Sequence, residues 1–302
     1  MNVTARVGVM VLATSVLAAV GIAAASTGEA AAGARHPALG ARTARPRSVS
    51  PGPASQPKGY AIVDSAFTAG GGTQTTGSVT CPANTVVYGG GDAANGGLGT
   101  NLGSSHPTSD GVWAVAINNR IPGPEGFDVW AVCAHMPKGY TQVASRVVDD
   151  PAASQAQAVA TCPAGLKVLG GGGSSNSIST MVNMNTSIPK FLPNSKRYAW
   201  QVNMNNATAD EIAFRAWAVC GKVPGFALQK GSVVANGAGS ATEATVACPL
   251  GTVPLGGGVR SNSTSTAVNI FSTWPYAGGW LTLENNADSV DHTARAFVTC
   301  AT

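Results

Sequence analysis

From about residue 59 to the end of the chain, apolar and polar positions alternate in the way that β-strands require. The segment from Trp113 to Asn119 and the segment from Trp200 to Asn206 both place a large apolar side chain at every second position. No segment in this region has the 3.6-residue period of an amphipathic helix. Turn-forming residues separate the short runs, so the pattern predicts an all-β fold with about six strands in every ~80 residues.

The same arrangement of residues occurs three times. The stretch CPANTVVYGGG begins at Cys81, CPAGLKVLGGG at Cys162 and CPLGTVPLGGG at Cys248. Each is followed by a tryptophan with an asparagine pair, and then by an aromatic residue three positions before a second cysteine. Internal repetition of this kind sets the architecture, and it predicts three tandem β repeats at residues 59–138, 139–224 and 225–302.

Within each repeat, the Cys-Pro element predicts a tight turn between two strands. Proline suits a turn position with φ near −65°, and the fourth residue is Asn84, Gly165 or Gly251, types that tolerate a positive φ. The glycine triplets beginning at Gly89, Gly170 and Gly256 lack side chains where a strand should pack. We expect a bulge, a bend or the close approach of another backbone there.

The N-terminal part of the chain differs in composition. Residues 1–25 contain one arginine and a long apolar run that ends in small residues, which predicts a secretory signal peptide. Residues 26–58 are rich in Pro, Ala and Arg and predict a flexible tether. The protein is therefore expected to be secreted, extracellular or attached to the cell surface, with no membrane insertion after signal cleavage.

Charge argues against a nucleic-acid partner. Residues 59–302 hold 12 Lys and Arg against 13 Asp and Glu, a net charge of −1, whereas phosphate recognition needs a basic face. Five of the remaining basic residues lie in the 26–58 segment, where they could meet an anionic polymer or simply keep a linker soluble.

The six cysteines fall two to each repeat. The separations are 52 residues for Cys81 and Cys133, 58 for Cys162 and Cys220, and 52 for Cys248 and Cys300. We expect one disulfide within each repeat, as is typical of exported proteins. An alternative also respects the repeat, in which Cys133 pairs with Cys162, Cys220 with Cys248, and Cys300 with Cys81.

The motif CPxGxVxxGGG, followed by Trp and then AVC, resembles a cysteine-bearing β module found at the C-terminus of bacterial collagen-like and tail-fibre-like surface proteins. That resemblance implies a trimer-like assembly, here covalently joined in one chain. The repeat count and strand content are also similar to the β-prism of vitelline membrane outer layer proteins. The predicted architecture is thus a pseudo-threefold, β-prism-like body, with three small β-sandwiches in a row as the alternative, and we expect a monomer with internal pseudo-symmetry.

No constellation of residues predicts catalysis, a metal site or a cofactor. His106, His135 and His292 fall at unrelated places in their repeats, and no nucleophile elbow accompanies them. The adjacent carboxylates Asp149–Asp150 and Asp210–Glu211 do not recur. We therefore expect a protein that is not an enzyme.

The residues that do recur are aromatic and amide, a combination that carbohydrate sites favour. The candidate ligand-binding residues are Trp113, Asn118, Asn119, Trp200, Asn205, Asn206, Trp280, Asn285 and Asn286. This predicts a binding or adhesion protein with three equivalent sites for cell-wall or extracellular glycan. The first alternative is a structural surface or matrix protein in which the same residues form core and turns, and the second is a glycan-active enzyme.

Overall fold

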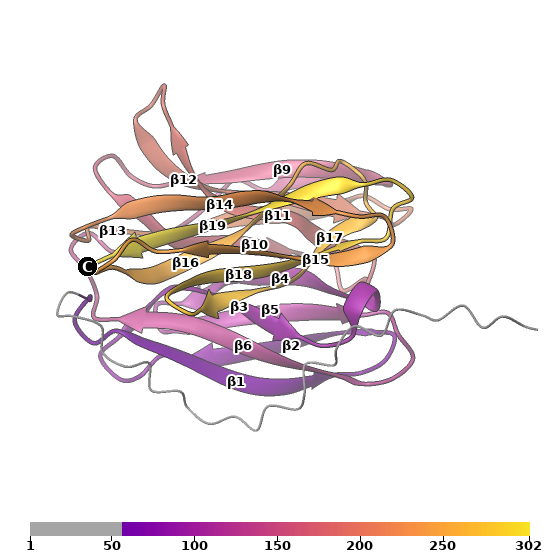
Figure 1. Ribbon diagram of the computed structural model, residues 1–302, viewed down its shortest axis with the longest axis horizontal. Helices are drawn as coiled ribbons and strands as arrows, with labels where there is room; N and C mark the ends of the chain where they lie inside the picture. Colours follow the sequence, from indigo (N-terminus) through magenta and orange to yellow (C-terminus); the bar gives the residue numbers. More distant parts are fainter. Residues whose placement is uncertain (1–55) are drawn as a thin grey trace, which may run out of the picture. The chain divides into compact units, whose positions relative to one another are not determined.

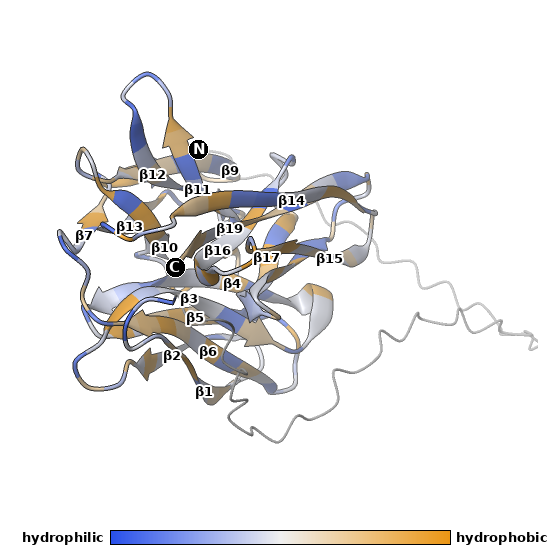
Figure 2. Ribbon diagram, turned by 60° about the vertical axis from the view of Figure 1, so that its left-hand side comes forward, coloured by the Kyte–Doolittle hydropathy of each residue, from blue (hydrophilic) through white to orange (hydrophobic). Residues whose placement is uncertain are grey.

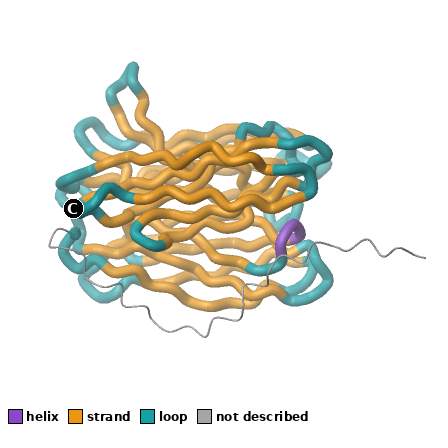
Figure 3. Tube along the Cα trace, viewed as in Figure 1, coloured by secondary structure: helices purple, strands orange, loops and turns teal. Residues whose placement is uncertain are grey.

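The computed structural model describes residues 56–302 and arranges them as strands β1 to β19, joined by turns and one short 3₁₀ helix, η1 (Gly97–Gly99) (Figure 1). Figure 3 shows how completely strands dominate this part of the chain. The predicted all-β class is confirmed. The predicted signal peptide at 1–25 and nearly all of the predicted 26–58 tether lie outside the described residues.

The strands form several separate sheets, in which all the pairings are antiparallel. The first sheet runs in the order β1 (Ala61–Ala69), β6 (Glu125–Ala134), β3 (Val86–Ala94), β17 (Val268–Tyr276), β18 (Gly279–Asn286) and β15 (Ser240–Ala247). The second runs β2 (Thr73–Thr80), β5 (Val112–Asn119), β4 (Thr100–Ser109), β10 (Lys167–Ser175), β13 (Ile212–Gly221) and β7 (Thr141–Ala144), and β8 (Val148–Asp150) also pairs with β13. The third consists of β11 (Val182–Leu192), β12 (Arg197–Asn206) and β9 (Ser154–Thr161), and the fourth of β14 (Ala227–Asn236), β19 (His292–Ala301) and β16 (Val253–Ser261).

Two of these sheets cross the boundaries predicted between repeats. Strand β3 pairs with β17 at Asp92 and Thr273, and β10 pairs with β4 at Gly173 and Ser105. Residues 59–138 therefore share one sheet with residues 225–302 and another with residues 139–224. Three separate sandwiches in a row do not describe this arrangement, because the described residues belong to one compact unit with a continuous hydrophobic core.

Hydrophobic and hydrophilic positions are interspersed along the strands (Figure 2), and the buried apolar side chains pack together in that core. It includes Leu102, Leu169 and Leu255, each fully buried, and the three tryptophans described below. Burial of such side chains is the main favourable contribution to the stability of the fold.

Each glycine triplet lies at a bulge and against another backbone, as the sequence predicts. The register shifts by one residue immediately before Gly89, Gly170 and Gly256. A Cβ atom on Gly89 would lie 2.8 Å from the Cα of Gly256, one on Gly256 would lie 2.6 Å from the Cα of Gly170, and one on Gly170 would lie 2.6 Å from the Cα of Gly89. Only glycine permits three backbones to approach one another this closely.

The three disulfides are those favoured from the sequence. Cys81 is bonded to Cys133, Cys162 to Cys220 and Cys248 to Cys300, with Cα–Cα distances of 5.7, 5.7 and 5.8 Å. The alternative that links successive repeats is wrong. On the chain-entropy model, a closed loop of this length stabilises the fold by about 4 kcal/mol.

The Cys-Pro turn exists but begins one residue later than predicted. The carbonyl of Pro82 accepts a hydrogen bond from the Thr85 amide, so proline is the first residue of the turn and not the second. Asn84 is then the third residue and has a φ of 66°, as a type II turn requires. Gly165 and Gly251, at the corresponding positions, both have a φ of 78°.

Candidate functional site

The three recurring tryptophans lie in the interior. Trp113, Trp200 and Trp280 have exposed fractions of 0%, 0% and 1%. Each indole Nε1 donates a hydrogen bond to a buried hydroxyl, those of Ser105 (2.9 Å), Ser187 (2.9 Å) and Thr273 (2.7 Å). Each ring packs against the middle glycine of a triplet, namely Gly90, Gly171 and Gly257. A sugar ring cannot stack on faces that the protein itself covers on both sides.

The first asparagine of each pair joins two distant parts of the chain. The Nδ2 atoms of Asn118, Asn205 and Asn285 donate to the carbonyls of Val182 (2.7 Å), Val268 (2.8 Å) and Thr100 (2.9 Å), and to the side-chain oxygens of Asn183, Asn269 and Asn101. Residues 59–138 thus contact 139–224, which contact 225–302, which contact 59–138 again. All three amides are buried, so they act as internal junctions.

The second asparagine of each pair holds the turn that follows. The Nδ2 atoms of Asn119, Asn206 and Asn286 each donate to the carbonyl four residues later, that of Gly123 (2.8 Å), Asp210 (2.7 Å) and Val290 (2.9 Å). Each Oδ1 accepts the backbone N–H two residues later, the pattern of an Asx turn. The nine candidate ligand-binding residues are therefore core, junction and turn residues, the alternative that the sequence also allowed.

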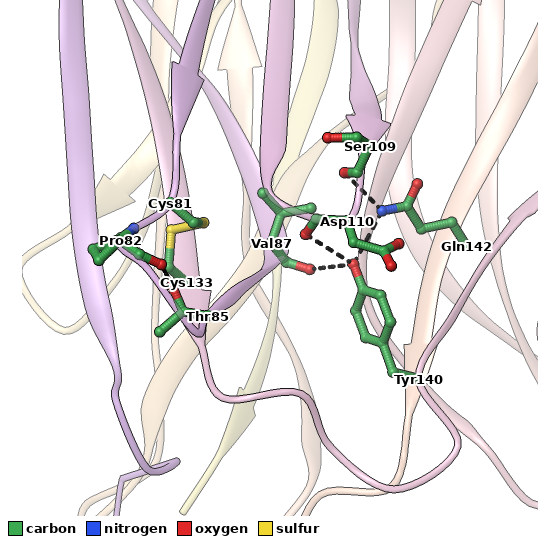
Figure 4. The surroundings of a disulfide bond; sticks show 9 residues. All are labelled: Cys81, Pro82, Thr85, Val87, Ser109, Asp110, Cys133, Tyr140 and Gln142. Carbon is green, nitrogen blue, oxygen red and sulfur yellow. Dashed lines mark hydrogen bonds between the residues drawn. A yellow bond between two sulfur atoms is a disulfide. The ribbon is translucent and has the colours of Figure 1, made fainter.

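Aromatic residues at the start of two predicted repeats contact a neighbouring part of the chain. Tyr140 Oη donates to the carbonyl of Val87 at 3.0 Å, close to the Cys81–Cys133 disulfide (Figure 4). Tyr60 Oη donates to the carbonyl of Pro254 at 2.8 Å. Val87 and Pro254 each lie six residues after the first cysteine of their repeat, so the two tyrosines make equivalent contacts.

Two of the three fully buried carboxylates have strongly raised pKa values, and the third is that of Asp150. Asp92 and Glu284 both have an exposed fraction of 0%. Burial raises the pKa of Asp92 well above its ordinary value, and the nearby polar groups of Ser272 and Thr273 offset this only in part. Burial likewise raises the pKa of Glu284 to about 7, although Asn236 Nδ2 (2.9 Å) and Ser261 Oγ (3.1 Å) donate to its Oε1 atom. Neither carboxylate can meet a substrate without opening of the core.

The histidines do not assemble a nucleophilic site. His106 stacks on Trp217 with 5.8 Å between ring centroids, and burial lowers its pKa to about 4. His292 Nε2 lies 3.0 Å from Asp288 Oδ2 and 3.3 Å from Ser263 Oγ. A Ser-His-Asp relay needs the carboxylate and the hydroxyl on opposite ring nitrogens, whereas here one nitrogen meets both.

A hollow of about 510 Å³, open to solvent, lies where β14 bulges between Lys230 and Val233. It is lined by Lys230, Arg295, Ser232 and Thr245 among others, and no acidic residue lines it. Arg295 Nε donates to the carbonyl of Gly231 at 2.7 Å, which fixes the guanidinium beside the bulge. The lining is therefore positively charged, and it holds no pair of groups that matches a catalytic arrangement.

One exposed feature was missed from the sequence, a hairpin of β11 and β12 that projects from the body (Figures 1 and 3). The spacing of the cysteines could have indicated this longer hairpin. Cys162 and Cys220 are 58 residues apart, against 52 for the other two pairs, and the six additional residues fall before Trp200.

Among residues 56–302, no group of three or more His, Cys, Asp or Glu side chains is placed to hold a metal ion, and no helix is long and apolar enough to cross a bilayer. No protein-family model matches the chain, and no curated protein matches it in sequence.

Proposed function

We propose that this protein is a secreted, non-catalytic structural component of the cell surface or extracellular matrix, whose β-body resists unfolding and proteolysis. The observation that carries the proposal is the structural role of each type of recurring residue. The tryptophans pack the core, the first asparagines join distant segments, the second asparagines hold turns, and the cysteines form disulfides. The recurring residues therefore stabilise the fold, and none of them is left exposed to bind a ligand.

We further propose that residues 59–302 are three repeats arranged with pseudo-threefold symmetry, like a β-prism. Two sets of cyclic contacts support this, the mutual approach of Gly89, Gly256 and Gly170 and the chain of amide junctions from Asn118, Asn205 and Asn285. Each set runs once around the three segments and returns to its start, as contacts about a threefold axis do.

Export fits the covalent chemistry of the fold. Disulfides persist in oxidising compartments, and all six cysteines of the chain are paired. Detection of the mature protein in the medium or at the surface of intact cells is the expected outcome of fractionation. Recovery with reduced cysteines from the cytoplasm would contradict it.

Limited proteolysis tests the structural role. Residues 59–302 offer trypsin 12 Lys and Arg residues, yet we expect early cleavage only within residues 26–58 and at the loop of the projecting hairpin. After reduction and alkylation, each lost loop closure removes about 4 kcal/mol, and the body should be degraded. Cleavage inside the strands of the oxidised protein, as fast as within residues 26–58, would refute the proposal.

A further inference from the structure

The β11–β12 hairpin has no counterpart of equal length elsewhere among the described strands. Strands β11 and β12 have 11 and 10 residues joined by a four-residue loop, whereas β17 and β18 have 9 and 8 residues joined by two. The added residues extend beyond the body, where they contribute little to the core (Figure 1). Because the tip of this hairpin packs so little against the protein, it is a candidate for contact with an external ligand.

One face of the hairpin base carries a ladder of aromatic rings. Phe191 and Tyr198 are cross-strand partners with centroids 5.1 Å apart, and Tyr198 packs edge-on against Phe226 at 5.0 Å. Lys167 Nζ lies 4.6 Å from the centroid of Tyr198. Phe191, the outermost ring, is 46% exposed. Figure 2 shows hydrophobic and hydrophilic segments side by side on this hairpin.

The hairpin region carries positive charges that form no ion pair. Residues 151–209 contain Lys167, Lys190, Lys196 and Arg197 and no Asp or Glu. In the part of the chain that the structure describes, the one ion pair within 4 Å joins His292 and Asp288, so none of these four cations has a carboxylate partner. Their charge is available to an external anion.

Lys196 gives independent support. It is exposed at the end of the hairpin loop with a φ of 52°, a left-handed conformation that costs an L-residue about 1–2 kcal/mol and that glycine adopts freely. The corresponding loop between β17 and β18 places Ala277 and Gly278 in this region of φ. A lysine at such a position brings a charge to the tip at a cost in stability.

We propose that the β11–β12 hairpin binds an anionic polysaccharide, with the exposed Phe191 stacking on a sugar ring and Tyr198 supporting Phe191, while Lys196 and Lys167 pair with carboxylate or sulfate groups. Aromatic faces cover the apolar side of a pyranose ring, and ammonium groups supply the charge complement. The polar tip, Pro193 to Lys196, does not suit insertion into lipid. This inference is independent of the structural role proposed above.

Binding of the full chain to immobilised polymers tests the inference. The probes are dextran sulfate against unsubstituted dextran, and polygalacturonate against its methyl ester, so that each pair differs only in charge. We expect the protein to bind one or both charged polymers, to ignore the neutral ones and to bind more weakly as salt is raised. Phe191→Ala and Lys196→Gly should each weaken binding about three- to tenfold.

Two control variants test whether binding depends on the hairpin itself or on any exposed ring or exposed cation of the protein. Tyr276→Ala removes a ring that is 44% exposed on the β17–β18 hairpin, and Lys230→Gln removes an exposed cation from β14; both should bind like the wild type. Lys196→Gly relieves a strained φ and should keep or raise the melting temperature, so weaker binding cannot be attributed to misfolding. Unchanged binding by both hairpin variants, equal losses in the control variants, or tighter binding to single-stranded DNA or to phosphatidylserine vesicles would each overturn the proposal.

Discussion

The buried Glu284 predicts that this protein loses stability as the pH rises through neutrality. Its pKa is raised by burial from 4.5 to about 7 in the folded protein. Between these values the folded state binds more protons than the unfolded state, so the free energy of unfolding is largest below pH 4.5 and falls as the pH rises to about 7. A difference of about 2.5 pH units corresponds to about 3 kcal/mol. Because the side chain is fully buried, screening by solvent does not reduce this figure.

The substitution Glu284→Gln isolates the effect. The amide keeps an oxygen that can accept from Asn236 and Ser261 but carries no charge at any pH. Urea unfolding should therefore give similar free energies for variant and wild type at pH 4.5, and a variant that is about 3 kcal/mol more stable at pH 8. Other buried acids, such as Asp92, are present in both proteins and cancel in the difference. A difference between the two proteins that does not change with pH would refute the reasoning.

Three further substitutions test the junctions. Asn205→Ala removes a buried amide that bonds to the next segment and should cost about 2–4 kcal/mol in urea unfolding; a loss below about 0.5 kcal/mol would contradict its role. Phe226→Tyr introduces a hydroxyl at the position where Tyr60 and Tyr140 have one, and by analogy with them we expect it to donate to the carbonyl of Val168. This should raise the free energy of unfolding by about 1 kcal/mol, and no change or a loss would be the contrary result. Gly256→Ala should lower the free energy of unfolding by about 3 kcal/mol or abolish folding, because its Cβ would lie 2.6 Å from another backbone. The control Gly123→Ala adds a Cβ that meets nothing within 4 Å and should change the free energy of unfolding by less than about 0.5 kcal/mol. Equal effects of the two substitutions would contradict the close approach.

Much of the fold followed from local pattern. Alternation predicted the strands, the two cysteines of each repeat predicted their own bond, and the glycine triplet predicted bulges and close backbones. These features depend on residues near one another in sequence or on the chemistry of one residue type, so the sequence carries them directly.

The place of the tryptophans did not follow, because alternation assigns a side chain to one face of a strand but does not say what covers that face. Trp113 donates its indole hydrogen to Ser105 within its own sheet and packs against Gly90, which belongs to β3 of another sheet. The partner of Asn118 lies 64 residues away. An asparagine that hydrogen-bonds to a distant segment and an asparagine that binds a sugar can have the same local sequence.

The hydrogen bonds that join the first, second and third segments in a ring also constrain the order in which the segments fold. Asn285 bonds to the carbonyl of Thr100, 185 residues earlier in the chain, and β17 is the partner that completes the sheet beside β3. Until residues 225–302 are available to fold, β3 retains an unpaired edge and the first segment cannot reach its final state. Such long-range pairing makes folding slow and leaves an intermediate prone to aggregate. Refolding should therefore be rate-limited by closure of the first segment on the third, and truncation before β17 should yield an insoluble product.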